Sequence, residues 1–192
     1  MTSSPKPYKS SKPAAAAAAA AAPLSTSTWL QVAQDFLTAD GWPFELAEDE
    51  GGSESLALLT RFQGESGIHD ITLEVDEGLG LVVVHVRLPV QLIAEDGQDE
   101  EQIAEIISGV AELVVRLNAG LAVGGLDLEI DEGTVTFRVG MLLDGVPPVQ
   151  AAVRNAVYTA VQSADRYAPL VAAVASGEID AAGALEALAE GE

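Results

Sequence analysis

The stretch of sequence that decides the fold is residues 69–88, HDITLEVDEGLGLVVVHVRL. Apolar and polar residues alternate from His69 to Val75, which is the period of a strand with one buried face. An acidic turn at residues 76–78 separates this part from a second apolar run. The pattern predicts an antiparallel hairpin with strands over roughly 69–75 and 79–88. Pro89 is expected to end the second strand, because proline cannot donate to a β ladder.

The same acidic phrase recurs further along the chain. Residues 128–133, LEIDEG, repeat residues 73–78, LEVDEG. The repeat predicts a second hairpin with strands over 126–131 and 134–142. A two-residue turn at 132–133 keeps its apolar side chains on one face and pairs residues whose numbers sum to 265. Asp127 then faces Arg138.

The two-residue register also places the two histidines of the chain. Applied to the first hairpin, it pairs residues whose numbers sum to 155 and puts Asp70 opposite His85, with His69 on the apolar face. On this interpretation His85 is a surface histidine near an acid and His69 a partly buried one. A three-residue turn would instead make His69 face His85. Such a pair could begin a metal site, although no acid is placed as a third ligand, so no metal is expected.

Helices flank the two hairpins. Thr28 and Gln31 form a Thr-x-x-Gln capping box before a helix that Gly41 ends, and Asp99 and Gln102 form another before a helix to about residue 117. Two further strands are expected near 44–46 and 56–62. In the last third, a helix begins near Val149, is kinked or broken at Pro169 and stops at Gly177, and Asp180 caps a short final helix.

The expected order is α-β-β-β-β-α-β-β-α-α, which predicts an α+β fold with an antiparallel sheet packed against helices. The domain is assigned to residues 28–192. Residues 1–27 form a tail rich in lysine, proline and alanine, in which nine alanines between prolines are too few for a stable helix, so the tail is expected to be disordered. Its basic start and alanine run also resemble a signal peptide, but the run lacks Leu, Val and Phe.

Charge restricts the partners. All three lysines lie in the tail, and the rest of the chain has six arginines against 30 acids. Such a field repels phosphate backbones and anionic lipids, so neither nucleic acid nor a membrane is expected as a partner. The acidity fits either a solvated surface or recognition of a basic or aggregation-prone segment. The absence of cysteine is typical of a reducing compartment, so we expect a cytoplasmic protein.

Motifs for catalysis are lacking. No glycine-rich phosphate loop follows a strand, and no serine stands in a Gly-x-Ser-x-Gly elbow. Among 30 acids, paired carboxylates carry little information. We therefore expect a protein that is not an enzyme and holds no cofactor, with a metal protein or enzyme using His69 and His85 as the alternative.

Five short motifs lie along the chain. They are DGWPFE at 40–45, Phe62-x-Gly64, Arg87-Leu88-Pro89, NAGL at 118–121 and Asp165-Arg166-Tyr167-x-Pro169. Together they resemble the YbjN-domain family, including its cyanobacterial members. The resemblance spans about residues 28–188 and implies a fold like that of type III secretion chaperones, an antiparallel sheet packed on helices in a homodimer. It implies no catalytic residues.

The function expected from this resemblance is protein binding. The protein would hold a segment of a partner on its surface, as a secretion-chaperone-like or adaptor protein, or would regulate a sensory or stress response through protein contacts. The candidate partner-binding or structural residues are Trp42, Arg87, Arg138 and Tyr167. Trp42 and Tyr167 are expected mainly to pack, and Arg87 and Arg138 to pair with acids across the sheet.

Overall fold

The computed structural model describes residues 28–48, 56–93, 99–143 and 145–190. The predicted α+β order is confirmed, whereas the disorder predicted for residues 1–27 lies outside the described residues. The elements are α1 (Trp29–Ala39), β1 (Phe44–Glu48), β2 (Leu56–Gln63), β3 (Ile68–Asp76), β4 (Leu81–Gln91), α2 (Glu100–Asn118), β5 (Gly125–Glu129), β6 (Thr134–Leu142), α3 (Gln150–Ala175) and α4 (Ala181–Glu190).

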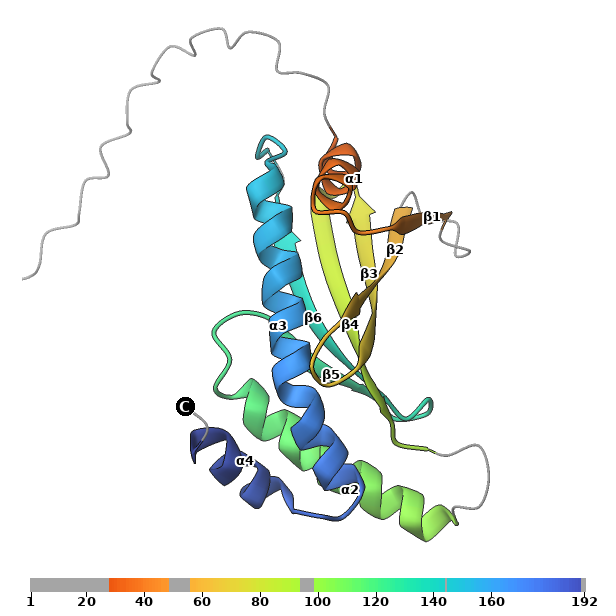
Figure 1. Cartoon of the computed structure of the whole chain (residues 1–192), viewed down its shortest axis with the longest axis vertical. Helices are drawn as coiled ribbons and strands as arrows, with labels where there is room; N and C mark the ends of the chain where they lie inside the picture. Colours follow the sequence, from red (N-terminus) through yellow and green to blue (C-terminus); the bar gives the residue numbers. More distant parts are fainter. Residues whose placement is uncertain (1–27, 49–55, 94–98, 144, 191–192) are drawn as a thin grey trace, which may run out of the picture.

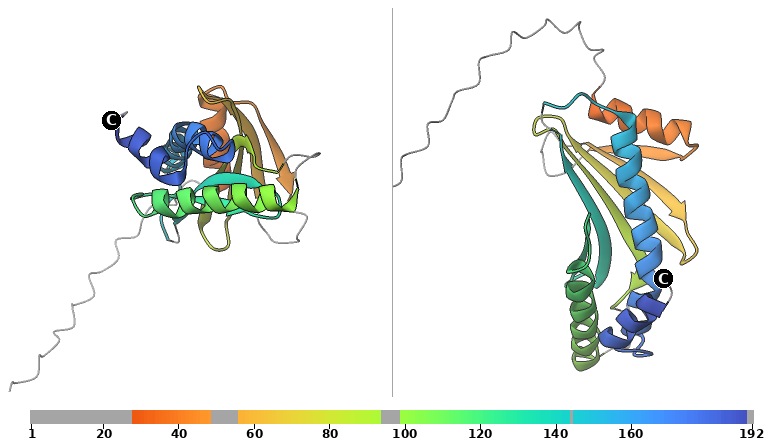
Figure 2. Two further views of the ribbon diagram at one scale, coloured as in Figure 1. Left: turned by 90° about the horizontal axis from the view of Figure 1, so that it is seen from below. Right: turned by 90° about the vertical axis from the view of Figure 1, so that its left-hand side faces the viewer.

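All six strands form one antiparallel sheet in the order β1-β2-β3-β4-β6-β5. The long helix α3 runs along one face of this sheet, with α1 packed beside it, while α2 and α4 pack against the other end of α3 (Figures 1 and 2). Alternate residues of the strands point into the layer between sheet and helices, which is the core. Its fully buried members include Phe36, Leu58, Leu73, Val84, Phe137, Val157 and Val161.

Helix ends follow the predicted signals with one exception. The Thr28 side chain accepts a hydrogen bond from the Gln31 amide at 3.1 Å, but the Gln31 side chain donates to Asp35, so the reciprocal half of that capping box is absent. At Gly41, whose φ is +74°, the amide of Trp42 donates back to the Leu37 carbonyl, as in a Schellman motif. The capping box predicted at the start of α2 is present in both halves, and Asp180 caps α4.

Both hairpin registers were predicted wrongly by two residues. Thr72 pairs with His85 and Glu129 pairs with Thr134, so each turn contains four residues. In the first turn the Asp76 carboxylate accepts from the amide of Leu79, which closes a longer turn than the spacing indicates. Because the error is an even number, every side chain keeps its predicted face, except that Ile130 lies exposed in the turn.

Two proline predictions are also corrected: Pro89 does not end its strand, and Pro169 does not break its helix. The strand β4 continues through Pro89 to Gln91, and its pairing with β6 shifts register between Arg87 and Gln91, which accommodates the missing donor. The helix α3 continues through Pro169 and ends at Ser176 and Gly177, where its end was predicted. Because proline has no N–H, the helical hydrogen bond from position 169 to the Asp165 carbonyl is missing. The packing of α3 on the sheet stabilises the helix on both sides of this gap.

Candidate functional site

A partly buried polar cluster ties the β2–β3 loop to α3. We call it the Asp165 cluster, comprising Glu65, Ser66, His69 and Asp165. The Asp165 carboxylate accepts hydrogen bonds from the Ser66 amide at 2.8 Å, the Ser66 hydroxyl at 2.5 Å and the Glu65 amide at 3.0 Å. These bonds join residues about a hundred positions apart in sequence, and they hold the loop against the helix.

The imidazole of His69 completes this cluster. Its side chain is fully buried, with Nε2 3.0 Å from the Ser66 hydroxyl and 3.3 Å from Asp165, and with Nδ1 3.2 Å from the Arg87 carbonyl. In a catalytic triad the serine gives its proton to the imidazole, which a carboxylate orients through the other ring nitrogen. Here the serine donates to the carboxylate and both groups face the same nitrogen, so the arrangement supports a structural role.

The Asp165 carboxylate is held in its ionised form. Partial burial opposes ionisation, but the hydroxyl and amide of Ser66, the amide of Glu65 and the His69 ring together lower its pKa well below the usual range. There is no space for a side chain beside it, since a Cβ at Gly64 would lie within contact distance of all three carboxyl atoms of Asp165. Glycine is therefore the residue that fits at position 64 without displacing the Asp165 carboxylate.

An aromatic cluster adjoins this site and contains Trp42. The half-buried Trp42 ring stacks on Phe62 with centroids 5.6 Å apart, and it meets Tyr158 edge-on at 6.0 Å. The Tyr158 hydroxyl donates to Asp40 at 2.8 Å, a hydrogen bond that raises the pKa of the phenol. Trp42 thus packs the end of α1 onto β2, while contact with a partner stays a prediction for this residue.

The opposite side of the sheet is turned away from α3, and we call it the open face. The alternate residues that point to it are exposed or half-buried except Thr134, which is buried, and no described helix covers it (Figure 2). Three cross-strand charge pairs lie on it: Arg61–Asp70 at 2.7 Å, Arg138–Asp127 at 2.6 Å and His85–Glu74 at 3.5 Å.

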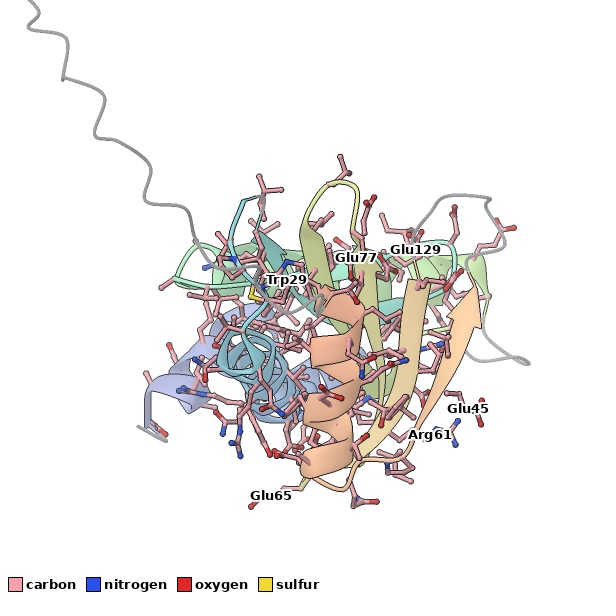
Figure 3. The ribbon with its side chains drawn as sticks, turned by 90° about the horizontal axis from the view of Figure 1, so that it is seen from above. Trp29, Glu45, Arg61, Glu65, Glu77 and Glu129 are labelled. Atoms are coloured by element: carbon pink, nitrogen blue, oxygen red, sulfur yellow. The ribbon has the colours of Figure 1, made fainter. Side chains whose placement is uncertain are left out.

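The open face is hollowed near β1. A concavity of about 540 Å³ lies over β1, β2 and β3. Figure 3 shows Glu45 and Arg61, two of the residues that line it, on the side of the sheet away from α1. Its lining comprises Pro43, Phe44, Glu45, Leu59, Thr60, Arg61, Asp70, Ile71 and Thr72.

The remaining candidate residues divide between the two faces. Arg138 pairs with Asp127 as predicted, although the backbone of Asp127 lies opposite Thr136. Arg87 pairs with no acid among the described residues: Asp70 lies opposite it but binds Arg61, and Arg87 donates to the neutral side chain of Gln91 at 3.1 Å. Tyr167 is buried on the helix side, where it stacks on Phe137.

The metal alternative loses its geometric basis. His69 points into the core and His85 lies on the open face, so the two cannot hold one ion between them. Within the described residues no group of three or more potential ligands could hold a metal. Likewise, none of the described helices is long and apolar enough to cross a membrane.

Sequence reasoning missed Gly64, Ser66 and Asp165. A signal was present, because Phe62-x-Gly64 and Asp165-Arg166-Tyr167 are two of the motifs that carry the resemblance, and these motifs meet in space. The motif Arg87-Leu88-Pro89 joins them through the Arg87 carbonyl and through Pro89, which packs beside Gly67. Spacing along the chain does not indicate that these motifs meet.

Comparison with known proteins identifies the family. No match was found among curated proteins or among solved structures. A family model does match residues 31–173, a span that contains the Asp165 cluster, the aromatic cluster and all six strands. The family is described as "Putative bacterial sensory transduction regulator". The chain therefore belongs to the YbjN family.

Proposed function

We propose that this chain is a non-enzymatic, protein-binding regulator that holds an extended segment of a partner protein on the open face of its sheet. The observation that carries the proposal is the open face itself, which is hollowed over β1–β3 and which no described helix covers. Sheets of α+β domains bury one face on helices, and the other face is available for contacts.

The chemistry of this face suits a protein partner. Its charges are arranged in pairs that are partly exposed, such as Arg138 and Asp127 at 49% and 50%, so they can exchange partners with little desolvation cost. Aliphatic side chains lie between them, including Leu59 and Val83. A mixed surface of this kind is typical of protein interfaces. The excess of acids elsewhere on the chain disfavours nucleic acid.

Two roles follow from protein binding. In the first, the protein acts as an adaptor or as a chaperone of the kind found in type III secretion, keeping a partner segment extended on the sheet. In the second, it regulates a sensory or stress response through the same contact, which the description of its family favours. Deletion that alters the expression of many genes, with no stable partner recovered, would favour the second role over the first.

A homodimer belongs to the proposal as well. Ile103, Ile106 and Ile107 of α2 lie on one face of the helix and are only half-buried within one chain. A second copy packed along α2 would cover them and leave the open face accessible. Light scattering at micromolar concentration should give twice the chain mass, and a monomer would contradict this part of the proposal.

Site-specific crosslinking tests the main proposal. A photoreactive amino acid at Thr72, in the hollow, should crosslink in cells to one contiguous segment of a partner, identified by mass spectrometry. The control carries the same group at Gln162, on the exposed side of α3. A synthetic copy of the crosslinked segment should then bind the purified chain and prevent crosslinking at Thr72. Identical adducts from both positions, or none from Thr72, would contradict the proposal.

A further inference from the structure

The two edges of the sheet differ in how they are protected. The outer edge of β5 is occupied at Leu126, whose amide donates to the Asn118 side chain and whose carbonyl accepts from it, both at 2.8 Å. The asparagine amide thus replaces a neighbouring strand at this point. The end of α2, which carries Asn118, also packs against β5.

The outer edge of β1 has no such cover. Among the described residues, none pairs with the side of β1 that faces away from β2. Alternate backbone N–H and C=O groups of an edge strand point outward and are free to accept a further strand. Leu46 lies on the helix side of β1 and is nevertheless 52% exposed, so an added strand would also gain apolar contact there.

Charge indicates which strand would be accepted. The strand β1, Phe-Glu-Leu-Ala-Glu, has two acids and no base, and the chain outside residues 1–27 has six arginines against 30 acids. Natural edge strands are protected by shortness, by charged side chains, especially lysine, and by proline. The five-residue strand β1 contains neither lysine nor proline, and its two charges are glutamates, which repel an acidic strand but attract a basic one. Pairing with β1 of a second copy would bring two acid-rich strands together, and like charges on neighbouring strands repel. A basic strand would be attracted to the glutamates of β1 and would not be repelled in this way.

We propose that β1 is the docking strand of the molecule, and that it takes up an extended basic segment of another protein as a seventh strand. The proposal rests on the function proposed above and names its partner by chemistry. Side chains alternate between the faces of a strand. The segment would therefore place apolar residues beside Leu46 on the helix side and Lys or Arg beside Glu45 on the open face, next to the hollow.

A defined peptide provides the probe. We would measure the binding of an end-capped peptide of alternating valine and lysine to the full chain by fluorescence anisotropy, beside the matching valine–glutamate peptide. The lysine peptide should bind and the glutamate peptide should not. A third peptide, the lysine sequence with N-methyl groups on alternate residues, cannot complete a β ladder and should lose the binding, whereas purely electrostatic attraction would tolerate it.

Matched variants locate the site. Glu45→Lys reverses an exposed acid on β1 and should weaken the lysine peptide about tenfold at low salt. Glu129→Lys makes the same change on β5, at the capped edge, and should leave binding nearly unchanged (Figure 3). In ¹⁵N spectra the peptide should shift the amides of residues 44–48 rather than those of 125–129.

Failure of this inference can be told apart from failure of the proposed function. Retained affinity of the N-methyl peptide, an equal effect of the two variants or shifts at β5 would each overturn docking at β1. Crosslinking of a partner at Thr72 could still succeed, and the open face would then bind without strand addition. Loss of crosslinking at Thr72 would overturn the proposed function itself.

Discussion

The two histidines of the chain show how differently the two faces of one sheet are built. His69 on β3 and His85 on β4 belong to paired strands, yet they point to opposite sides. The His69 ring is fully buried and both of its nitrogens have partners within 3.3 Å. The His85 ring is 30% exposed and its partner, Glu74, is 3.5 Å away.

This contrast separates residues that hold the fold from residues that are available for contacts. On the helix side, polar groups are desolvated and every change leaves a buried partner unsatisfied, so the stability of the fold depends on them. On the open face, charges are partly hydrated and losing one is inexpensive. Substitutions on the two faces should therefore differ in effect, and the expected differences are ordered below by size.

The largest loss of stability is expected from Asp165→Ala. The substitution leaves the Ser66 hydroxyl and two loop amides without their acceptor, beside a buried imidazole. Leaving partly buried donors without their charged acceptor costs at least about 1–3 kcal/mol. The free energy of unfolding from urea titration should fall by that amount. A loss below about 1 kcal/mol would show that the Asp165 cluster does not hold the loop.

Gly64→Ala should cost about 1–3 kcal/mol, the usual range for overpacking in a well-packed region. A methyl group at this position would overlap the Asp165 carboxylate, so the carboxylate must leave its hydrogen bonds or the loop or helix must move. Gly140→Ala is the matched control on the open face, because nothing lies within 4 Å of a Cβ built there. Comparable losses for the two variants would contradict the contrast between the faces.

The difference between local and distant contacts also explains what could be predicted from the sequence. Element order, faces and helix caps depend on residues a few positions apart, and the order of all ten elements and the capping box at Asp99 and Gln102 are confirmed. The registers were missed because turn length depends on side-chain contacts. In the second hairpin, a backbone contact from a distant segment also acts on the turn, because the amide of Leu92, just after β4, donates to the Gly133 carbonyl.

The Asp165 cluster was beyond prediction for the same reason. Its hydrogen bonds join positions 65 and 66 to position 165, and no periodicity relates them. Arg87 shows a second limit. The observed register gives the face of Arg87 and places Asp70 opposite it. Arg61 also lies within reach of Asp70, and the carboxylate pairs with Arg61.

Acid should reveal the ionised state of Asp165 in the native fold. Since its folded-state pKa lies below the unfolded value of about 4, the carboxylate stabilises the fold above that pH and the contribution is lost as pH falls through the folded pKa. Asp165→Asn cannot titrate. The free energy of unfolding should therefore fall more steeply below about pH 4 in the parent chain than in the variant. Equal slopes would show that the pKa is not depressed.

On the open face, Arg138→Ala should cost no more than about 1 kcal/mol, because both members of its pair with Asp127 are about half exposed. The cost should shrink further in high salt, which screens exposed charges. Chemical denaturation at low and high salt measures both effects. A loss as large as that from Asp165→Ala would mean that the open face is part of the folded framework.

The smallest effect is expected from His85→Ala, and it tests the comparison most directly. The exposed ring and the 3.5 Å separation from Glu74 leave little interaction to lose, so the change in unfolding free energy should stay within about 0.5 kcal/mol. His69→Ala removes the same side chain from the adjacent strand. It leaves a cavity, and the Ser66 hydroxyl and the Arg87 carbonyl each lose a hydrogen-bond partner. The free energy of unfolding should therefore fall several times more than for His85→Ala. If both variants bind a partner segment less well but only His69→Ala unfolds more readily, His85 acts in the contact itself. Equal destabilisation by the two would remove the distinction between a structural face and a binding face.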